Sequence, residues 1–187
     1  MAATAHAQAI KQDSQTYLTT ALFQLLRTHA LNEIKITTLT RRAGVSRMAF
    51  YRNYQTVADV LVAYFEPRIA NLFDAAITHA QAKTQQETAF FAELKDELQL
   101  AVARNYEYVI RDIFNRHMQR YYQQTPVWAA LDEVAQRYWT AFMSAGVYAI
   151  WREWLLAGQG ETLEELHQLI GDFQRATMAI LDQRRNA

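Results

Sequence analysis

The chain has 187 residues, of which 51% are hydrophobic, with five glycines, two prolines and no cysteine. This composition argues against disorder, favours long helices over many short strands, and excludes disulfides and thiolate metal sites. The longest apolar run without a charge, 138–151, is too short to span a bilayer, and nothing resembles a signal peptide, so we expect a soluble, cytoplasmic protein without a membrane partner.

The charges are unevenly divided although the formal net charge is zero. Residues 1–60 carry seven Lys or Arg and three Asp or Glu, a balance of +4, and the remaining residues carry the compensating −4. A basic N-terminal part on a more acidic remainder suits a protein that contacts phosphates through that part alone. Chance is the alternative explanation for an imbalance of four charges.

The first predicted helix begins near Ser14. Residues 1–11 are mostly Ala, Gln and Thr without an apolar stripe, and we expect them to form a frayed tail. From Ser14 to about His29, apolar residues recur at three- and four-residue steps, which predicts one buried helix face. These residues are Tyr17, Leu18, Ala21, Leu22, Leu25 and Leu26. We expect this helix to pack behind the two short helices that follow, because they are too small to bury a core alone.

A helix-turn-helix is predicted in residues 34–61. A short run, 37–42, meets Gly44, whose freedom to take a positive φ suits a tight corner between two helices. Ser46 is a good N-cap for the next run, 47–54, because its hydroxyl can accept a hydrogen bond from an otherwise unpaired backbone N–H. The layout is that of a motif whose second helix enters a DNA groove.

At these residues the chain resembles the TetR family of bacterial transcriptional regulators. The likeness is carried by Ala43-Gly44-Val45-Ser46-Arg47, then Phe50-Tyr51-Arg52, and the aromatic Tyr54. Upstream, residues in the family's core positions are Ala21, Leu22, Leu25, Leu26, Ile34, Ile36 and Leu39. The likeness covers about residues 15–62. Beyond them it is loose and limited to Gly146, Trp154-Leu155 and Gly158.

The helical signals along the whole chain, with no stretch that alternates as a strand, predict an all-α fold of about nine helices, and the resemblance agrees with this class. It implies a DNA-binding domain with a three-helix helix-turn-helix at residues 1–57, and a helical effector-binding and dimerisation domain at 58–187. The expected function is that of a repressor, which binds a palindromic operator in double-stranded DNA as a homodimer and is released by a small-molecule effector. No cofactor is implied.

Arg47, Tyr51 and Arg52 are the first candidates for DNA contacts, because arginine reaches guanine edges or phosphates and a tyrosine hydroxyl can bind phosphate. The full set of predicted DNA-binding residues is Thr37, Thr38, Arg41, Ser46, Arg47, Met48, Tyr51, Arg52 and Tyr54. Phe50 and Val45 are expected in the core.

Two positions depart from the family pattern. Family members usually have threonine in place of Lys35, and many have lysine in place of Val57, so a helix cap and a phosphate contact are in question. Arg41 or Arg42 could supply the phosphate contact that Val57 cannot make. The alternative function is therefore a helical ligand-binding or protein-interaction module that has lost specific DNA binding.

The next helices are predicted from capping signals. Thr56 and Asp59 form a capping box that opens a helix, and Pro67 should either kink this helix or start a new one. A second signature, 84–87, opens a segment that runs to Tyr106, and another helix follows at 105–122.

The last two helices are predicted to be long. Pro126, as first helical residue, begins a helix that runs to about Ala157 and ends at Gly158. Thr162 and Glu165 then cap the last helix.

Large aromatic side chains are dense in the C-terminal part, which suggests a cavity for an apolar or aromatic effector. The residues predicted to line it are Phe73, Phe91, Phe114, His117, Tyr138 and Phe142. The alternative is that most of these rings form ordinary core or a dimer interface.

Small residues on the helix from Pro126 predict a close helix–helix contact. Ala141, Ala145 and Ala149 recur at four-residue steps beside Tyr138 and Phe142. The resemblance implies a homodimer through the two C-terminal helices, which would set two recognition helices about 34–36 Å apart on DNA. Packing of these alanines inside one subunit is the alternative.

No enzyme signature accompanies these features. The sequence has no H-x-x-x-H pair, acidic metal cluster, nucleophile elbow or phosphate loop, and Gly158-Gln-Gly160 lacks a third glycine. We therefore predict a non-enzymatic protein without a metal site.

Overall fold

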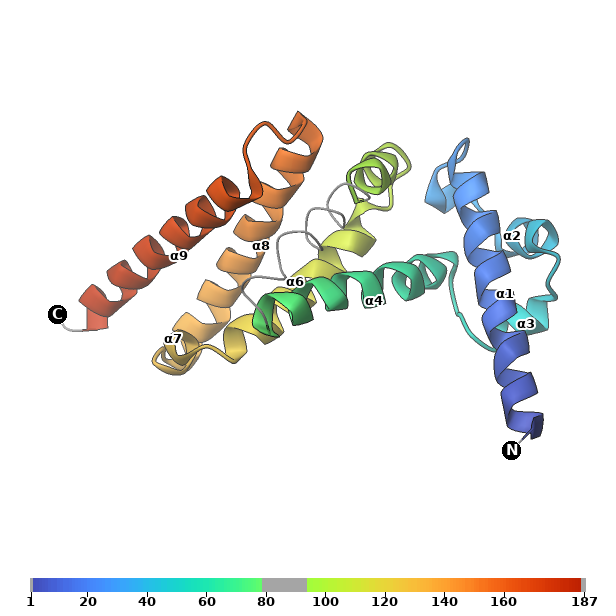
Figure 1. The fold of residues 1–187 in the computed structure, drawn as a ribbon, viewed down its shortest axis with the longest axis horizontal. Coiled ribbons are helices and arrows are strands. Elements are labelled where there is room, and N and C mark those ends of the chain that lie inside the picture. The colour runs from blue at the N-terminus through green and yellow to red at the C-terminus, as the bar shows by residue number, and fades with distance from the viewer. Residues whose placement is uncertain (1, 79–93, 186–187) are drawn as a thin grey trace. The chain divides into compact units, whose positions relative to one another are not determined.

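The computed structural model describes residues 2–78 and 94–185, and every regular element in these two ranges is a helix (Figure 1). The labelled elements are α1 (Ala2–Leu26), a 3-10 helix (Leu31–Glu33), α2 (Ile36–Ala43), α3 (Arg47–Tyr51), α4 (Val57–Thr78), α6 (Glu107–Gln123), α7 (Pro126–Ala129), α8 (Glu133–Ala157) and α9 (Leu163–Arg185). Residues 94–103 are also helical. The predicted all-α class is confirmed, with about nine helices. In these same ranges, no helix combines the length and the apolar character needed to cross a membrane.

The chain divides into two compact units. The first unit contains residues 1–68 and 99–113, and the second contains 69–98 and 114–187. The first unit therefore includes the N-terminal half of α4 and the start of α6 in addition to residues 1–57. The predicted boundary between a DNA-binding domain at 1–57 and an effector-binding domain at 58–187 stays a prediction.

The core of the first unit forms where α1 packs against α2. Leu18, Leu22 and Leu26 are fully buried at four-residue steps, as the helical period predicts, and Leu39 of α2 is buried with them. Tyr17 is the exception to the predicted buried stripe, because its side chain is 57% exposed.

The predicted start of α1 is wrong. The helix begins at Ala2 and not near Ser14, and its last residue is Leu26. Alanine and glutamine have high helix propensity, so residues 2–13 extend the helix although no apolar stripe requires it.

The capping box of α4 is confirmed. The Thr56 backbone N–H donates to Asp59 Oδ2 at 2.8 Å, and the Asp59 N–H donates to Thr56 Oγ1 at 3.3 Å. Burial alone would raise the pKa of the Asp59 carboxyl, but hydrogen bonds from Thr56 and Gln55 outweigh it and lower the pKa below the ordinary value. Pro67 lies inside the single helix α4, so it does not start a new helix. The capping signature at 84–87 lies outside the described residues.

The predicted helix from Pro126 to Ala157 is two helices. α7 ends at Ala129, and α8 begins at Glu133 because Asp132 acts as its N-cap, accepting a hydrogen bond from the Ala135 N–H at 2.8 Å. The Gln136 side-chain amide donates to the Leu131 carbonyl at 3.0 Å, which satisfies one backbone group of the break.

The signals that end α8 and begin α9 are confirmed. Gly158 has a φ of +103° at the end of α8. Thr162 and Glu165 form the predicted capping box, in which the Thr162 N–H donates to Glu165 Oε2 at 2.8 Å and the Glu165 N–H donates to Thr162 Oγ1 at 3.2 Å. Backbone and side-chain hydrogen bonds from Thr162 lower the pKa of the Glu165 carboxyl.

Candidate nucleic-acid interface

The corner between α2 and α3 has the geometry of a helix-turn-helix. Gly44 ends α2 with a φ of +68°, and its N–H donates to the carbonyls of Thr40 and Arg41. Ser46 is in an extended conformation, and its Oγ accepts a hydrogen bond from the Ala49 N–H at 3.1 Å. Both roles were predicted. They fix where α2 stops and α3 begins, and therefore which α3 side chains face outward.

The inner side of α3 is anchored by Phe50, which is fully buried. Its ring contacts the Tyr54 ring at a centroid distance of 5.7 Å. Tyr54 is only 6% exposed, and burial raises the pKa of its hydroxyl against the opposing effect of a hydrogen bond with Gln15 of α1. Tyr54 was predicted to contact DNA, but its burial places it in the core that supports α3. Val45, predicted in the core, is half-buried.

The outer side of α3 presents two arginines and a tyrosine. Arg47, Tyr51 and Arg52 are all exposed, and 52% of the Tyr51 side chain is accessible. The Arg47 guanidinium carbon lies 5.9 Å from the centre of the Tyr51 ring. Met48 is 76% exposed, a large apolar side chain on a helix that is otherwise polar on this side.

α2 contributes polar groups beside this corner. Thr37 and Arg41 are exposed, Thr38 is half-buried, and Ser46 is exposed at the start of α3. Arg42 is also exposed, and its Nε donates to Gln24 Oε1 of α1 at 2.8 Å, so its position is fixed relative to the helix behind it.

The charge distribution agrees with this arrangement. The described basic side chains of residues 13–60 are all exposed, namely Arg27, Lys35, Arg41, Arg42, Arg47 and Arg52. Two acids in the same range accept hydrogen bonds from backbone N–H groups, since Glu33 Oε2 accepts from the Ala30 N–H at 2.8 Å and Asp59 caps α4. Their negative charge is therefore partly neutralised at helix starts.

The predicted effector-binding residues do not form one site. In the second unit, Phe73 and Phe114 are buried with ring centroids 5.3 Å apart, and His117 stacks on Phe73 at 5.5 Å. Tyr138 and Phe142 are 63% and 64% exposed, so their prediction as cavity lining is wrong. They lie on the outer face of α8, whereas its inner face contains Trp139 and Met143. Phe91 lies outside the described residues.

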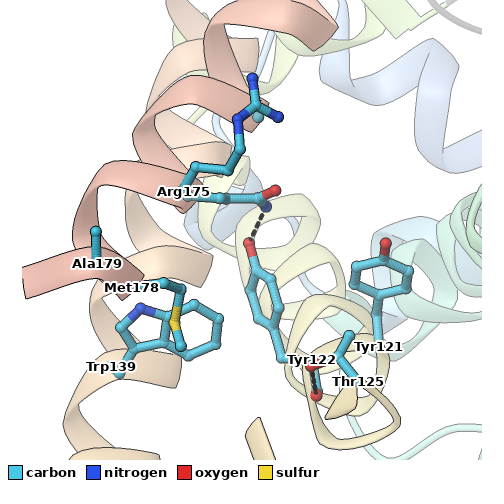
Figure 2. Close-up of a pocket in the computed structure, with 9 residues that line it drawn as sticks. Tyr121, Tyr122, Thr125, Trp139, Arg175, Met178 and Ala179 are labelled. Carbon is cyan, nitrogen blue, oxygen red and sulfur yellow. Dashed lines mark hydrogen bonds between the residues drawn. The ribbon is translucent and has the colours of Figure 1, made fainter. Parts of the chain in front are cut away.

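A hollow of about 430 Å³ lies in the second unit, at residues that were not predicted to line a cavity (Figure 2). It is lined by Tyr121, Tyr122, Thr125, Trp139, Gly171, Gln174, Arg175, Met178 and Ala179. Three separate parts of the chain, 121–125, Trp139 and 171–179, form it, so periodicity within any one helix does not reveal it. Within the described ranges, no group of three His, Asp or Glu side chains is placed to hold a metal ion.

No protein-family model matches the chain, and no curated protein matches it. Among solved structures, it is similar to the crystal structure of the TetR family repressor AlkX from Dietzia sp. strain DQ12-45-1b, which is implicated in biodegradation of n-alkanes. The TM-score is 0.43 and the sequence identity is 13%, over 90% of this chain and 95% of that chain. A similarity of this size assigns neither a family nor a function.

Proposed function

We propose that this protein is a TetR-like transcriptional regulator, acting as a repressor, that binds a palindromic DNA operator as a homodimer and is released by a small-molecule effector. The observation that carries the proposal is the exposed pair of Arg47 and Tyr51 on a helix whose start is fixed by Gly44 and Ser46. A recognition helix contacts bases through its N-terminal residues, which is where Arg47 lies.

The chemistry of the exposed residues matches this role. Arg47 can donate two hydrogen bonds to a guanine edge, and Tyr51 and Thr37 can donate hydroxyl hydrogen bonds to phosphates. Arg41 and Arg42 supply positive charge on the neighbouring helix, in place of the lysine that Val57 replaces. These contacts depend on a rigid support, and the burial of Phe50 beneath α3 supplies it.

The exposed apolar faces of α8 and α9 support a second copy of the chain as the partner. On α8, Tyr138 and Phe142 are exposed beside Ala141, Ala145 and Ala149, so these alanines do not pack inside the protomer. On α9, the exposed apolar side chains are Leu169, Phe173 and Ile180. Large apolar side chains gathered on two helices mark an interaction surface. A two-fold dimer through it would present two α3 helices to one palindrome.

The test begins with selection of bound sequences from a random duplex pool. Binding of the selected duplex is then measured by fluorescence anisotropy at several salt concentrations. If each dimer makes about 6–10 phosphate contacts, the log–log salt slope should be about −5 to −9. Arg47→Ala and Tyr51→Ala should each weaken binding at least about tenfold. A bidentate contact to a guanine is worth about 1–3 kcal/mol, a hydrogen bond to a charged phosphate is worth about 1.5–3 kcal/mol, and each contact occurs twice per dimer.

Two exposed residues outside α2 and α3 provide matched controls. Arg120→Ala and Tyr108→Ala remove the same side chains from α6, where both are exposed, and should leave the affinity unchanged. If no duplex is selected and the wild-type protein does not bind DNA even at low salt, the proposal is wrong. The alternative of a ligand-binding or protein-interaction module would then be favoured.

A further inference from the structure

The hollow in the second unit lies between α6 and α9, and its lining on the α6 side is aromatic. The end of α6 supplies Tyr121 and Tyr122, the turn after it supplies Thr125, and α9 supplies five residues from Gly171 to Ala179 (Figure 2). Trp139 of α8 completes the lining, and its ring meets the Tyr122 ring edge-to-face at a centroid distance of 4.8 Å. A space of about 430 Å³ with this lining is within the size range of small-molecule sites.

A hydrogen bond joins α6 and α9 at the hollow. The Gln174 Nε2 donates to the Tyr122 hydroxyl at 2.7 Å. Burial raises the pKa of Tyr122 to about 12, although the bond from Gln174 lowers it slightly, so the phenol is neutral at physiological pH. The hollow therefore has a rigid aromatic side that carries no negative charge.

The charged group of the lining is a single guanidinium. Arg175 is the one basic side chain among the nine lining residues, which include no Asp or Glu. Its Nη1 lies 3.1 Å from where a Cβ on Gly171 would stand, so the absence of a side chain at Gly171 lets the guanidinium lie against the helix. Its present partner is the exposed carboxylate of Asp172. An exposed pair of this kind contributes only about 0–1 kcal/mol, so an incoming anion can replace it.

We infer that this hollow is a binding site for a small aromatic carboxylate. The ring lies against the aromatic side of the hollow, and the carboxylate pairs with Arg175. Aromatic groups favour a flat apolar body, and guanidinium binds carboxylate through two parallel N–H donors. This site is separate from the cluster of Phe73, Phe114 and His117, and the inference does not depend on the proposed DNA binding.

Isothermal titration calorimetry with two probes tests the inference. 2-Naphthoate and 2-naphthamide share the same ring system and differ in charge. The full-length wild-type protein should bind 2-naphthoate at least about tenfold more tightly than 2-naphthamide. Arg175→Met keeps an unbranched apolar stem and removes the charge, so it should reduce 2-naphthoate affinity to that of 2-naphthamide. Ala179→Phe places a ring in the hollow and should abolish binding of both probes.

The control is Arg111→Met, which removes an exposed arginine that does not line the hollow, and it should leave both affinities unchanged. Far-UV circular dichroism confirms that each variant is folded. The inference is overturned if the wild-type protein binds neither probe at millimolar concentration, or if the preference for 2-naphthoate persists in Arg175→Met. The calorimetric titration contains no DNA, so its outcome does not test the proposed DNA binding. Likewise, the DNA-binding measurement does not test whether the hollow binds an aromatic carboxylate.

Discussion

The conformation of Gly44 predicts that a glycine-to-alanine substitution there lowers the free energy of unfolding, whereas the same substitution at Gly146 raises it. Gly44 has a φ of +68°, and a Cβ added there would meet no heavy atom within 4 Å. Gly44→Ala therefore costs backbone conformational energy without a steric clash. An alanine in the left-handed region costs about 1–2 kcal/mol. The smaller freedom of alanine in the unfolded chain offsets about 0.5 kcal/mol of this cost. The free energy of unfolding should fall by about 1 kcal/mol.

Gly146 provides the matched comparison. It lies inside α8 without a positive φ, and its added Cβ would also meet nothing within 4 Å. Gly146→Ala should therefore raise the free energy of unfolding by about 0.5–1 kcal/mol. Urea unfolding, followed by circular dichroism at one fixed protein concentration, measures both changes. Gly44→Asn should cost less than Gly44→Ala, because asparagine tolerates this conformation. If Gly44→Ala were neutral or stabilising, the assigned corner geometry would be refuted.

Three further predictions concern the cap of α4, the break before α8 and the exposed faces of α8 and α9. Asp59→Asn should destabilise the protein at pH 7. The difference in the free energy of unfolding between wild type and variant should shrink as the pH falls through the lowered pKa of the Asp59 carboxyl, because only the ionised form stabilises the fold. Urea unfolding at pH 7 and pH 3 measures this difference. Asp132→Ala removes the N-cap of α8 and should cost about 1 kcal/mol in the same assay; no loss would contradict the assigned cap. The double substitution Phe142→Glu and Phe173→Glu should convert the proposed homodimer to a monomer in light scattering, whereas Val102→Glu, at an exposed apolar position outside α8 and α9, should not.

Local capping chemistry was the most predictable part of the fold. The roles of Ser46, Thr56 with Asp59, and Thr162 with Glu165 depend on groups within four residues, so the sequence alone contains the information. Asp132 was missed although its signal is of the same kind, because Pro126 is also a valid helix start and the apolar run after it concealed the break. The corner at Gly44 and the burial of Phe50 followed from the motif.

The buried face of α8 was not predictable in the same way. Apolar and small residues occur on nearly every side of the segment 138–151, so the helical period does not distinguish Trp139, which is buried, from Tyr138, which is exposed. Only packing against α9 and α6 decides between them. The burial of Tyr54 has the same origin, since its environment depends on α1, which lies far away in sequence.

Helix α9 connects the two inferences about the second unit. Its exposed apolar residues are Leu169, Phe173 and Ile180, and its residues in the hollow are Gly171, Gln174, Arg175, Met178 and Ala179. At about 100° per residue, these sets lie on different sides of one helix. A ligand in the hollow and a second copy on the exposed face would therefore contact α9 from different sides, and a shift of α9 caused by one would alter the contacts of the other.

Such coupling is reciprocal, so it can be measured at either site. We expect 2-naphthoate to change the dimer dissociation constant of the wild-type protein in sedimentation equilibrium, and to have no effect on Arg175→Met. The two proteins should have the same dissociation constant without the probe, because the Arg175 guanidinium lies on the side of α9 away from the exposed apolar face. An equal change in both proteins would show that the probe acts at another site. No change in the wild-type protein, at a probe concentration that calorimetry shows to be saturating, would show that α9 does not transmit binding from the hollow to the dimer.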